Sequence, residues 1–295
     1  MERKVLGYSH FRKGPNKIFY YGIFQPISDA LKLFSKGIFK GYKSSFYFFV
    51  LGPFLGLFIM IILWGVFGRF FGIFGRFYSF IYVFCFMSLG VYFLLFCCWG
   101  GNSKYSLLGG YRSISQTVSY EVSLVFFVLV FVYFLYFYDL SVFYFFQVGY
   151  FFIFFCLIFF LGWGFIILAE SNRSPFDFSE RESELVSGFN VEYRGGVFSL
   201  IFICEYGIIL FLSFISICLF FGLSLFFLKF LFICFFFVWI RCCFPRYRYD
   251  LLIYRAWKVI LPFSLVFLIY VLALFFWVSI IFSDNVGILF IYIFI

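Results

Sequence analysis

The residues of this sequence best suited to move protons or charge are glutamates that lie in or beside apolar segments. Glu205 interrupts the apolar run GVFSLIFICEYGIILFL, about ten residues from its start, and Glu121 lies a few residues inside another apolar run that begins near Ser115. Glu170 and Glu192 border a long polar interval between two apolar segments. Because an ionisable group at membrane depth costs roughly 2.5–3.5 kcal/mol on insertion scales, these glutamates indicate a functional role.

The polar interval itself spans residues 168–194 and reads LAESNRSPFDFSERESELVSGFNVEYR. It carries six of the thirteen acidic side chains, although the chain as a whole is 65% hydrophobic. Pro175 and Gly188 mark its turns. Composition alone leaves two interpretations open, a solvated acidic loop and a functional acidic segment.

Several carboxyl groups at different depths suggest two kinds of chemistry. A low dielectric favours the neutral form of a carboxyl group, so buried glutamates can exchange protons near neutral pH. Bridged by water, such a series makes a proton relay or a path for charge. Alternatively, each glutamate pairs with an Arg, Lys or Tyr and only ties helices together. The spacing of the residues does not decide between the two.

The rest of the chain must position these groups inside a membrane. Mean hydropathy of +1.10 excludes a soluble protein, and apolar runs of about 20 residues, each able to cross a hydrocarbon core of about 30 Å, recur throughout. The short alternating segments of a β-barrel do not occur. The sequence therefore predicts an all-α, polytopic transmembrane helical bundle, with residues 1–295 as a single membrane domain.

We expect seven spans and three polar segments on the matrix side of them, at residues 1–43, 170–194 (an acidic loop) and 241–259. The spans are predicted at residues 44–67, 78–99, 115–138, 143–169, 195–222, 225–241 and 260–282. In the segment 1–43, Pro26 begins a short amphipathic helix whose apolar stripe (Ile27, Leu31, Phe34, Ile38) and lysine face (Lys32, Lys36, Lys40) are typical of a helix in the membrane interface. The stretch GNSKYSLLGGYRSISQ is interpreted as a glycine-rich loop leading into a helix, and residues 241–259 as a basic loop with a short helix.

Charge and cysteine content narrow the function further. Nineteen of the 22 Lys and Arg residues fall in segments 1–43, 100–112, 170–194 and 241–258, which the positive-inside rule places together on the matrix or cytoplasmic face. No soluble domain presents this charge, so we expect no nucleic-acid partner. The nine cysteines lie mostly in apolar runs without CxxC or Cys/His spacing, and His10 is the only histidine. We therefore expect small buried thiols and no bound metal.

Four blocks of the sequence resemble the NADH–ubiquinone oxidoreductase chain 1 family, the quinone-site membrane subunit of respiratory complex I. They are ERKVLGY with RKGPN and QPISDALKLFSK, then GNSKYSLLGGYRSISQ, then AESNRSPFDFSERESELVSGFNVEY, and finally WIRCCFPRYRYDLLIYRAW. Two departures stand out, Arg181 in place of the family's glycine and Gly37 in place of its glutamate. We expect Arg181 to form a salt bridge to a neighbouring glutamate or to a partner subunit.

The resemblance implies a subunit of a proton-translocating oxidoreductase in the mitochondrial inner membrane, with no redox centre and no covalently bound cofactor of its own. Ubiquinone would be the substrate, and Fe–S clusters, FMN and NADH would belong to partner subunits. The quinone chamber would be bordered by Arg3, Arg12, Asp29, Phe202 and Arg246. Asp29 has a plainer alternative as a helical partner of Lys32. The proton or charge relay toward antiporter-like partner subunits would use Glu121, Glu170, Glu180, Glu182, Glu184, Glu192 and Glu205.

Two other functions share parts of this pattern. A membrane hydrogenase uses a homologous anchor, and an ion transporter also uses buried carboxylates, although the inverted repeat typical of transporters is not evident. The family also has a transmembrane helix before ERKVLGY. The resemblance therefore leads us to expect that a separate polypeptide fills that position, or that the chain start is misassigned, and that membrane lipids contact the remaining surface.

Overall fold

A computed structural model describes residues 2–18, 20–37, 44–70, 78–147, 151–177, 188–222 and 224–281. Every regular element within these ranges is a helix, which confirms the predicted fold class. The elements are α1 (Glu2–Ser9), η1 (Tyr20–Gly22), α2 (Gln25–Phe34), α3 (Phe46–Phe70), α4 (Ser79–Gly101), α5 (Lys104–Leu135), α6 (Leu140–Phe146), α7 (Phe152–Phe155), α8 (Leu157–Glu170), η2 (Gly188–Asn190), α10 (Gly196–Phe220), α11 (Phe226–Cys243), α12 (Tyr249–Arg255), the π-helical turn η3 (Ala256–Ile260) and α13 (Leu261–Ile281).

Six helices of the described chain are long and apolar enough to cross a membrane, and they match six of the seven predicted spans. The remaining predicted span, 143–169, is divided into α6, α7 and α8. The last two meet at Cys156, whose backbone (φ −125°, ψ 45°) is not helical. An apolar run reveals how much chain can lie in lipid but not whether its helix is continuous, so this break was not predicted.

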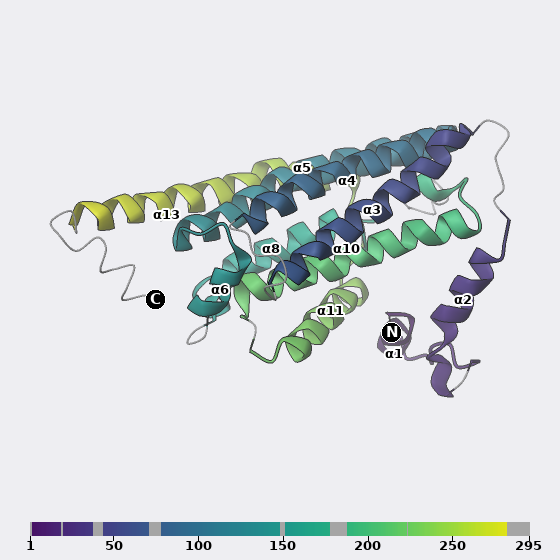
Figure 1. Ribbon diagram of the computed structural model, residues 1–295, viewed down its shortest axis with the longest axis horizontal. Coiled ribbons are helices and arrows are strands. Elements are labelled where there is room, and N and C mark those ends of the chain that lie inside the picture. The colour runs from purple at the N-terminus through teal and green to yellow at the C-terminus, as the bar shows by residue number, and fades with distance from the viewer. Residues whose placement is uncertain are drawn as a thin grey trace.

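The long helices form an elongated bundle (Figure 1). Helices α3 and α4 run antiparallel and approach closely, because a Cβ on Gly100 would lie 2.6 Å from the Phe49 Cα atom. Helix α10 runs parallel to α3, and the Trp64 indole donates a hydrogen bond to the Gly207 carbonyl (3.2 Å). Helix α8 packs between α5 and α10, where Trp163 is buried.

Helix α5 begins at Lys104, eleven residues before the predicted span, so the predicted glycine-rich loop is a helix. Ser103 and Ser106 form a reciprocal capping box, in which each hydroxyl accepts the other residue's backbone N–H (3.2 and 3.1 Å). Gly110 lies within the helix, and glycine is required there because a Cβ atom would lie only 2.2 Å from the Cys98 Cβ of α4. The two serines, three residues apart, mark the start of a helix, whereas the glycines alone suggested a loop.

The amphipathic helix is confirmed as α2, with Pro26 in its first turn. It lies at the edge of the bundle (Figure 1), where its C-terminal end meets the start of α10. Ile27, Leu31 and Phe34 are each more than half exposed, which is typical of an interfacial helix. At the other end of the chain, α12 continues through η3 into α13, so the short helix predicted in the basic loop joins the last span without a break.

Candidate functional site

Three polar segments that are distant in sequence meet at one site. Helix α1, the turn after α8 and the C-terminal end of α11 converge around Arg241, which forms an ion pair with Glu2 and donates from Nε to the Ser174 hydroxyl (2.8 Å). The loop after α11 joins them, since the Tyr247 backbone N–H donates to the Pro175 carbonyl (3.1 Å). The segments grouped by charge in the sequence are therefore also neighbours in space.

Glu205 forms an ion pair with Arg173 inside this site, with 2.7 Å between the carboxylate and the guanidinium. Their side chains are only 12% and 10% exposed. The same guanidinium lies over the rings of Tyr206 (4.6 Å) and Phe202 (5.7 Å), which adds cation–π attraction. The structural alternative, in which a glutamate ties helices together, therefore applies to Glu205 at least in part.

Tyr206 links this ion pair to the one at the N-terminal helix. Its hydroxyl donates to the Glu2 carboxylate at 2.5 Å, and Glu2 in turn pairs with Arg241. Glu2, Arg173 and Tyr206 were not predicted as site residues, and Arg173 was counted only among the basic residues of segment 170–194. The available clues were the position of Tyr206 directly after a glutamate in an apolar run and the charge of Glu2.

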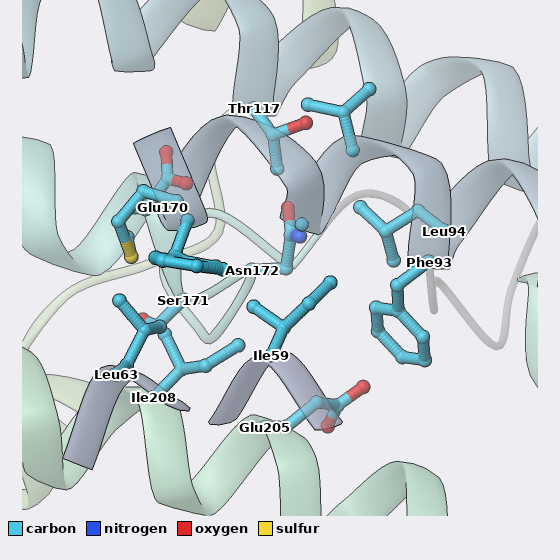
Figure 2. Close-up of a pocket in the computed structure, with 14 residues that line it drawn as sticks. Ile59, Leu63, Phe93, Leu94, Thr117, Glu170, Ser171, Asn172, Glu205 and Ile208 are labelled. Carbon is cyan, nitrogen blue, oxygen red and sulfur yellow. The ribbon is translucent and has the colours of Figure 1, made fainter. Parts of the chain in front are cut away.

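Glu205 and Glu170 both line a small cavity of about 50 Å³. Thr117, Ser171 and Asn172 contribute polar atoms to its wall, and the rest of the lining is mainly apolar (Ile59, Leu63, Phe86, Met87, Phe93, Leu94 and Ile208 among others). Figure 2 shows the two carboxyl groups on different sides of this lining. The volume is sufficient for a small number of water molecules.

Two polar atoms of residues that line this cavity lack a hydrogen-bond partner among the described residues. Glu170 Oε2 and Asn172 Oδ1 are buried and accept no hydrogen bond from the described residues. Both atoms are acceptors when Glu170 is ionised, and a water molecule in the cavity would supply the donor that each of them lacks. The arrangement suits a hydrated path better than a dry packing contact.

Glu121 extends the series on α5. It lies in the middle of that helix, not near its start as the sequence had suggested, and it is half-buried. Its charge acts on Glu170, so the two carboxyl groups repel each other when both are ionised. Glu170 on α8 therefore shares the cavity with Glu205 of α10 and interacts with Glu121 of α5.

The other predicted site residues differ in their positions. Arg3 pairs with Asp29 at 3.1 Å and joins α1 to α2, and Asp29 also accepts from Gln25 at 2.9 Å. In the described chain Asp29 has no ion pair with Lys32. Phe202 lies beside Arg173, while Arg12 and Arg246 are exposed. Glu192 lies against Gly101, away from the cavity lining. Glu180, Arg181, Glu182, Glu184, Ile38 and Lys40 fall outside the described residues.

The described residues contain no cluster of metal ligands. No three of their His, Cys, Asp and Glu side chains gather in a way that could hold a metal ion. The side chains around Arg173 and the cavity offer cations, aromatic rings and carboxyl groups.

Comparison with known proteins gives consistent matches over nearly the whole chain. The model of a family described as NADH dehydrogenase matches residues 1–272. The chain is 45% identical over 287 residues to NADH-ubiquinone oxidoreductase chain 1 of Anopheles gambiae, covering 96% of this chain and 91% of that protein. The same protein from Locusta migratoria is 44% identical over 278 residues (93% and 88% covered), and that from Patiria pectinifera is 41% identical over 286 residues (93% and 88%).

Proposed function

This chain belongs to the NADH–ubiquinone oxidoreductase chain 1 family, and from that premise we propose that it forms the membrane wall of a ubiquinone chamber and transmits quinone chemistry through buried carboxyl groups. As a family member it is a multi-pass subunit of complex I in the mitochondrial inner membrane, with other complex I subunits as its partners. The chamber and the carboxyl path are proposed from the geometry of the site.

The cluster around Arg173 supports the chamber. Phe202 and Tyr206 supply aromatic faces for a quinone ring, and Arg173 supplies a cation beside them. Arg3 and Asp29 form the neighbouring ion pair between α1 and α2. Arg12 and Arg246 are exposed and available to complete the chamber against a hydrophilic partner subunit. That partner would carry the Fe–S cluster that delivers electrons, with FMN and NADH held further away in the complex.

The cavity between Glu205 and Glu170 is the observation that carries the relay. Reduction of ubiquinone to ubiquinol takes up two electrons and two protons, so negative charge appears beside Arg173 and is then neutralised. That change competes with Glu205 for the guanidinium and alters how strongly Glu205 holds its charge. A proton or charge displacement then passes through the cavity to Glu170 and Glu121, and on to antiporter-like subunits.

The variant Glu205→Gln tests this proposal in the assembled complex. The amide keeps the shape of the side chain but removes its exchangeable proton and its charge. Because Arg173 then loses its buried counter-charge, we expect less assembled complex, and in the complex that does assemble a clearly lower ratio of protons pumped per electron. Asp139→Asn is the matched control, because Asp139 is also hydrogen-bonded, to Ser79 and Ser141, but does not line the cavity. A Glu205→Gln complex that pumps at the wild-type ratio would show that Glu205 is structural.

A further inference from the structure

One glutamine on α5 holds both ends of the turn that carries the site. Gln116 is fully buried, and its Nε2 donates one hydrogen bond to the Ala169 carbonyl (2.9 Å) and another to the Phe176 carbonyl (3.1 Å). These two carbonyls flank residues 170–175. A single side chain therefore ties the two ends of segment 170–175 together, and we call this pair of hydrogen bonds the clasp.

The clasped segment contains most of the contacts described above. Glu170 and Asn172 line the cavity, Arg173 pairs with Glu205, and Ser174 accepts the hydrogen bond from Arg241. The positions of these groups relative to one another depend on the path of six residues of backbone. Because Gln116 binds that backbone at both ends, its position sets theirs.

The chemistry of the clasp requires an amide. Two carbonyl oxygens are both acceptors, so the group between them must supply two hydrogens. A neutral NH₂ does so without placing a charge in a buried site, whereas a hydroxyl supplies one hydrogen and an ionised carboxylate supplies none. The Oε1 atom of Gln116 has no partner within the described residues, so only its donor side is in use.

We propose that Gln116 is a positioning residue for charge transmission, which holds segment 170–175 so that Arg173 meets Glu205 and Glu170 faces the cavity. This inference rests on the proposed function, since it concerns the same carboxyl path. Each lost hydrogen bond lowers the ratio of clasped to open segment by roughly fivefold. An open segment weakens the coupling between the quinone site and Glu170 while leaving the helices in place.

A second glutamine provides a matched control. Gln147 is also buried, and its Nε2 also donates to two backbone carbonyls, those of Cys218 (3.1 Å) and Leu219 (2.8 Å). Its Oε1 likewise has no partner among the described residues. These carbonyls lie near the C-terminal end of α10, whereas Glu205 lies in its N-terminal half. Substitution of Gln147 therefore removes the same interactions without touching the cavity.

The test compares Gln116→Met and Gln116→Glu with Gln147→Met and Gln147→Glu in the assembled complex. Methionine keeps the length of the side chain and removes both donors, and glutamate keeps the shape and removes the NH₂ group. The readouts are the amount of assembled complex, NADH oxidation by ubiquinone, and protons pumped per electron. The last is a ratio, so loss of assembled complex alone does not change it.

We expect both Gln116 variants to lower the proton-to-electron ratio at least twofold, while both Gln147 variants keep it. Equal ratios in all four variants, or a failure of both Gln116 variants to assemble, would overturn the proposal and make Gln116 purely structural. Glu205→Gln measured in the same preparations separates the two hypotheses. If Glu205→Gln pumps normally, the carboxyl path itself fails, and if only the Gln116 variants pump normally, the clasp alone fails.

Discussion

At the scale of single residues, the central feature is a buried arginine shared between a carboxylate and two aromatic rings. Removing one partner of a buried ion pair typically costs about 3–5 kcal/mol, because the remaining charge is left uncompensated. Arg173 and Glu205 are therefore strongly coupled, and a negative charge near Arg173 changes how strongly the guanidinium stabilises the ionised form of Glu205. Structural pairing and charge transmission are in this case two consequences of one contact.

Glu121→Gln is predicted to lower the proton-to-electron ratio while the complex assembles normally. The amide keeps the shape of the side chain but cannot take up or release a proton, and it removes the charge that acts on Glu170. Proton pumping measured against NADH oxidation in membrane vesicles gives the ratio. An assembled Glu121→Gln complex that pumps as wild type would place the end of the path at Glu170.

The sequence identified the glutamates of the cavity because each one interrupts or ends an apolar run. It could not identify their partners. Arg173 and Glu205 are 32 positions apart, and Tyr206 and Glu2 are 204 apart, so no local spacing connects them. Whether a buried carboxylate has a counter-charge depends on how the helices cross, and a hydropathy pattern does not specify helix crossings.

At the scale of the elements, the positions of the spans were predictable and their ends were not. The start of α5 was placed too late because glycines and charged residues in 101–112 look like a loop, whereas tight packing against neighbours explains the glycines. The predicted span 143–169 is divided into α6, α7 and α8, but it contains no proline that would have indicated the break at Cys156. Helix α1 was not predicted at all, since its hydrophobic pattern is weak over eight residues.

Gly109→Ala is predicted to destabilise the contact between α5 and the η2 turn. A Cβ at this position would lie 2.7 Å from the Gly188 Cα and 3.0 Å from the Phe189 nitrogen, and both are backbone atoms that cannot rotate away. Overpacking of this kind costs about 1–3 kcal/mol. We expect a lower thermal midpoint of the complex and less assembled enzyme.

Gly164→Ala in α8 is the matched control for this change. A Cβ there meets nothing within 4 Å, so alanine is tolerated and even favoured by about 0.5–1 kcal/mol through its helix propensity. If Gly109→Ala assembles and melts as Gly164→Ala does, the close approach of α5 to η2 is not required for stability.

At the scale of the whole molecule, the charged segments that are separate in the sequence lie together in the fold. The basic N-terminal segment, the acidic interval and the basic loop between α11 and α12 meet at one site, while the long apolar helices account for the rest of the bundle (Figure 1). The cavity lies next to this polar site, bounded by α3, α4, α5, α8 and α10. In the proposed function, this chain contributes to energy conversion by holding carboxyl groups between a polar surface and the membrane interior.

The most direct test of this account is an infrared difference spectrum of the assembled complex, recorded between the oxidised and quinone-reduced states. If reduction changes the protonation or hydrogen bonding of the cavity carboxyl groups, the carboxyl C=O stretching region must contain a difference band. We predict that this band is lost or shifted in Glu205→Gln and in Glu170→Gln but kept in Asp139→Asn. A spectrum in which all three variants show the wild-type bands would contradict the carboxyl path.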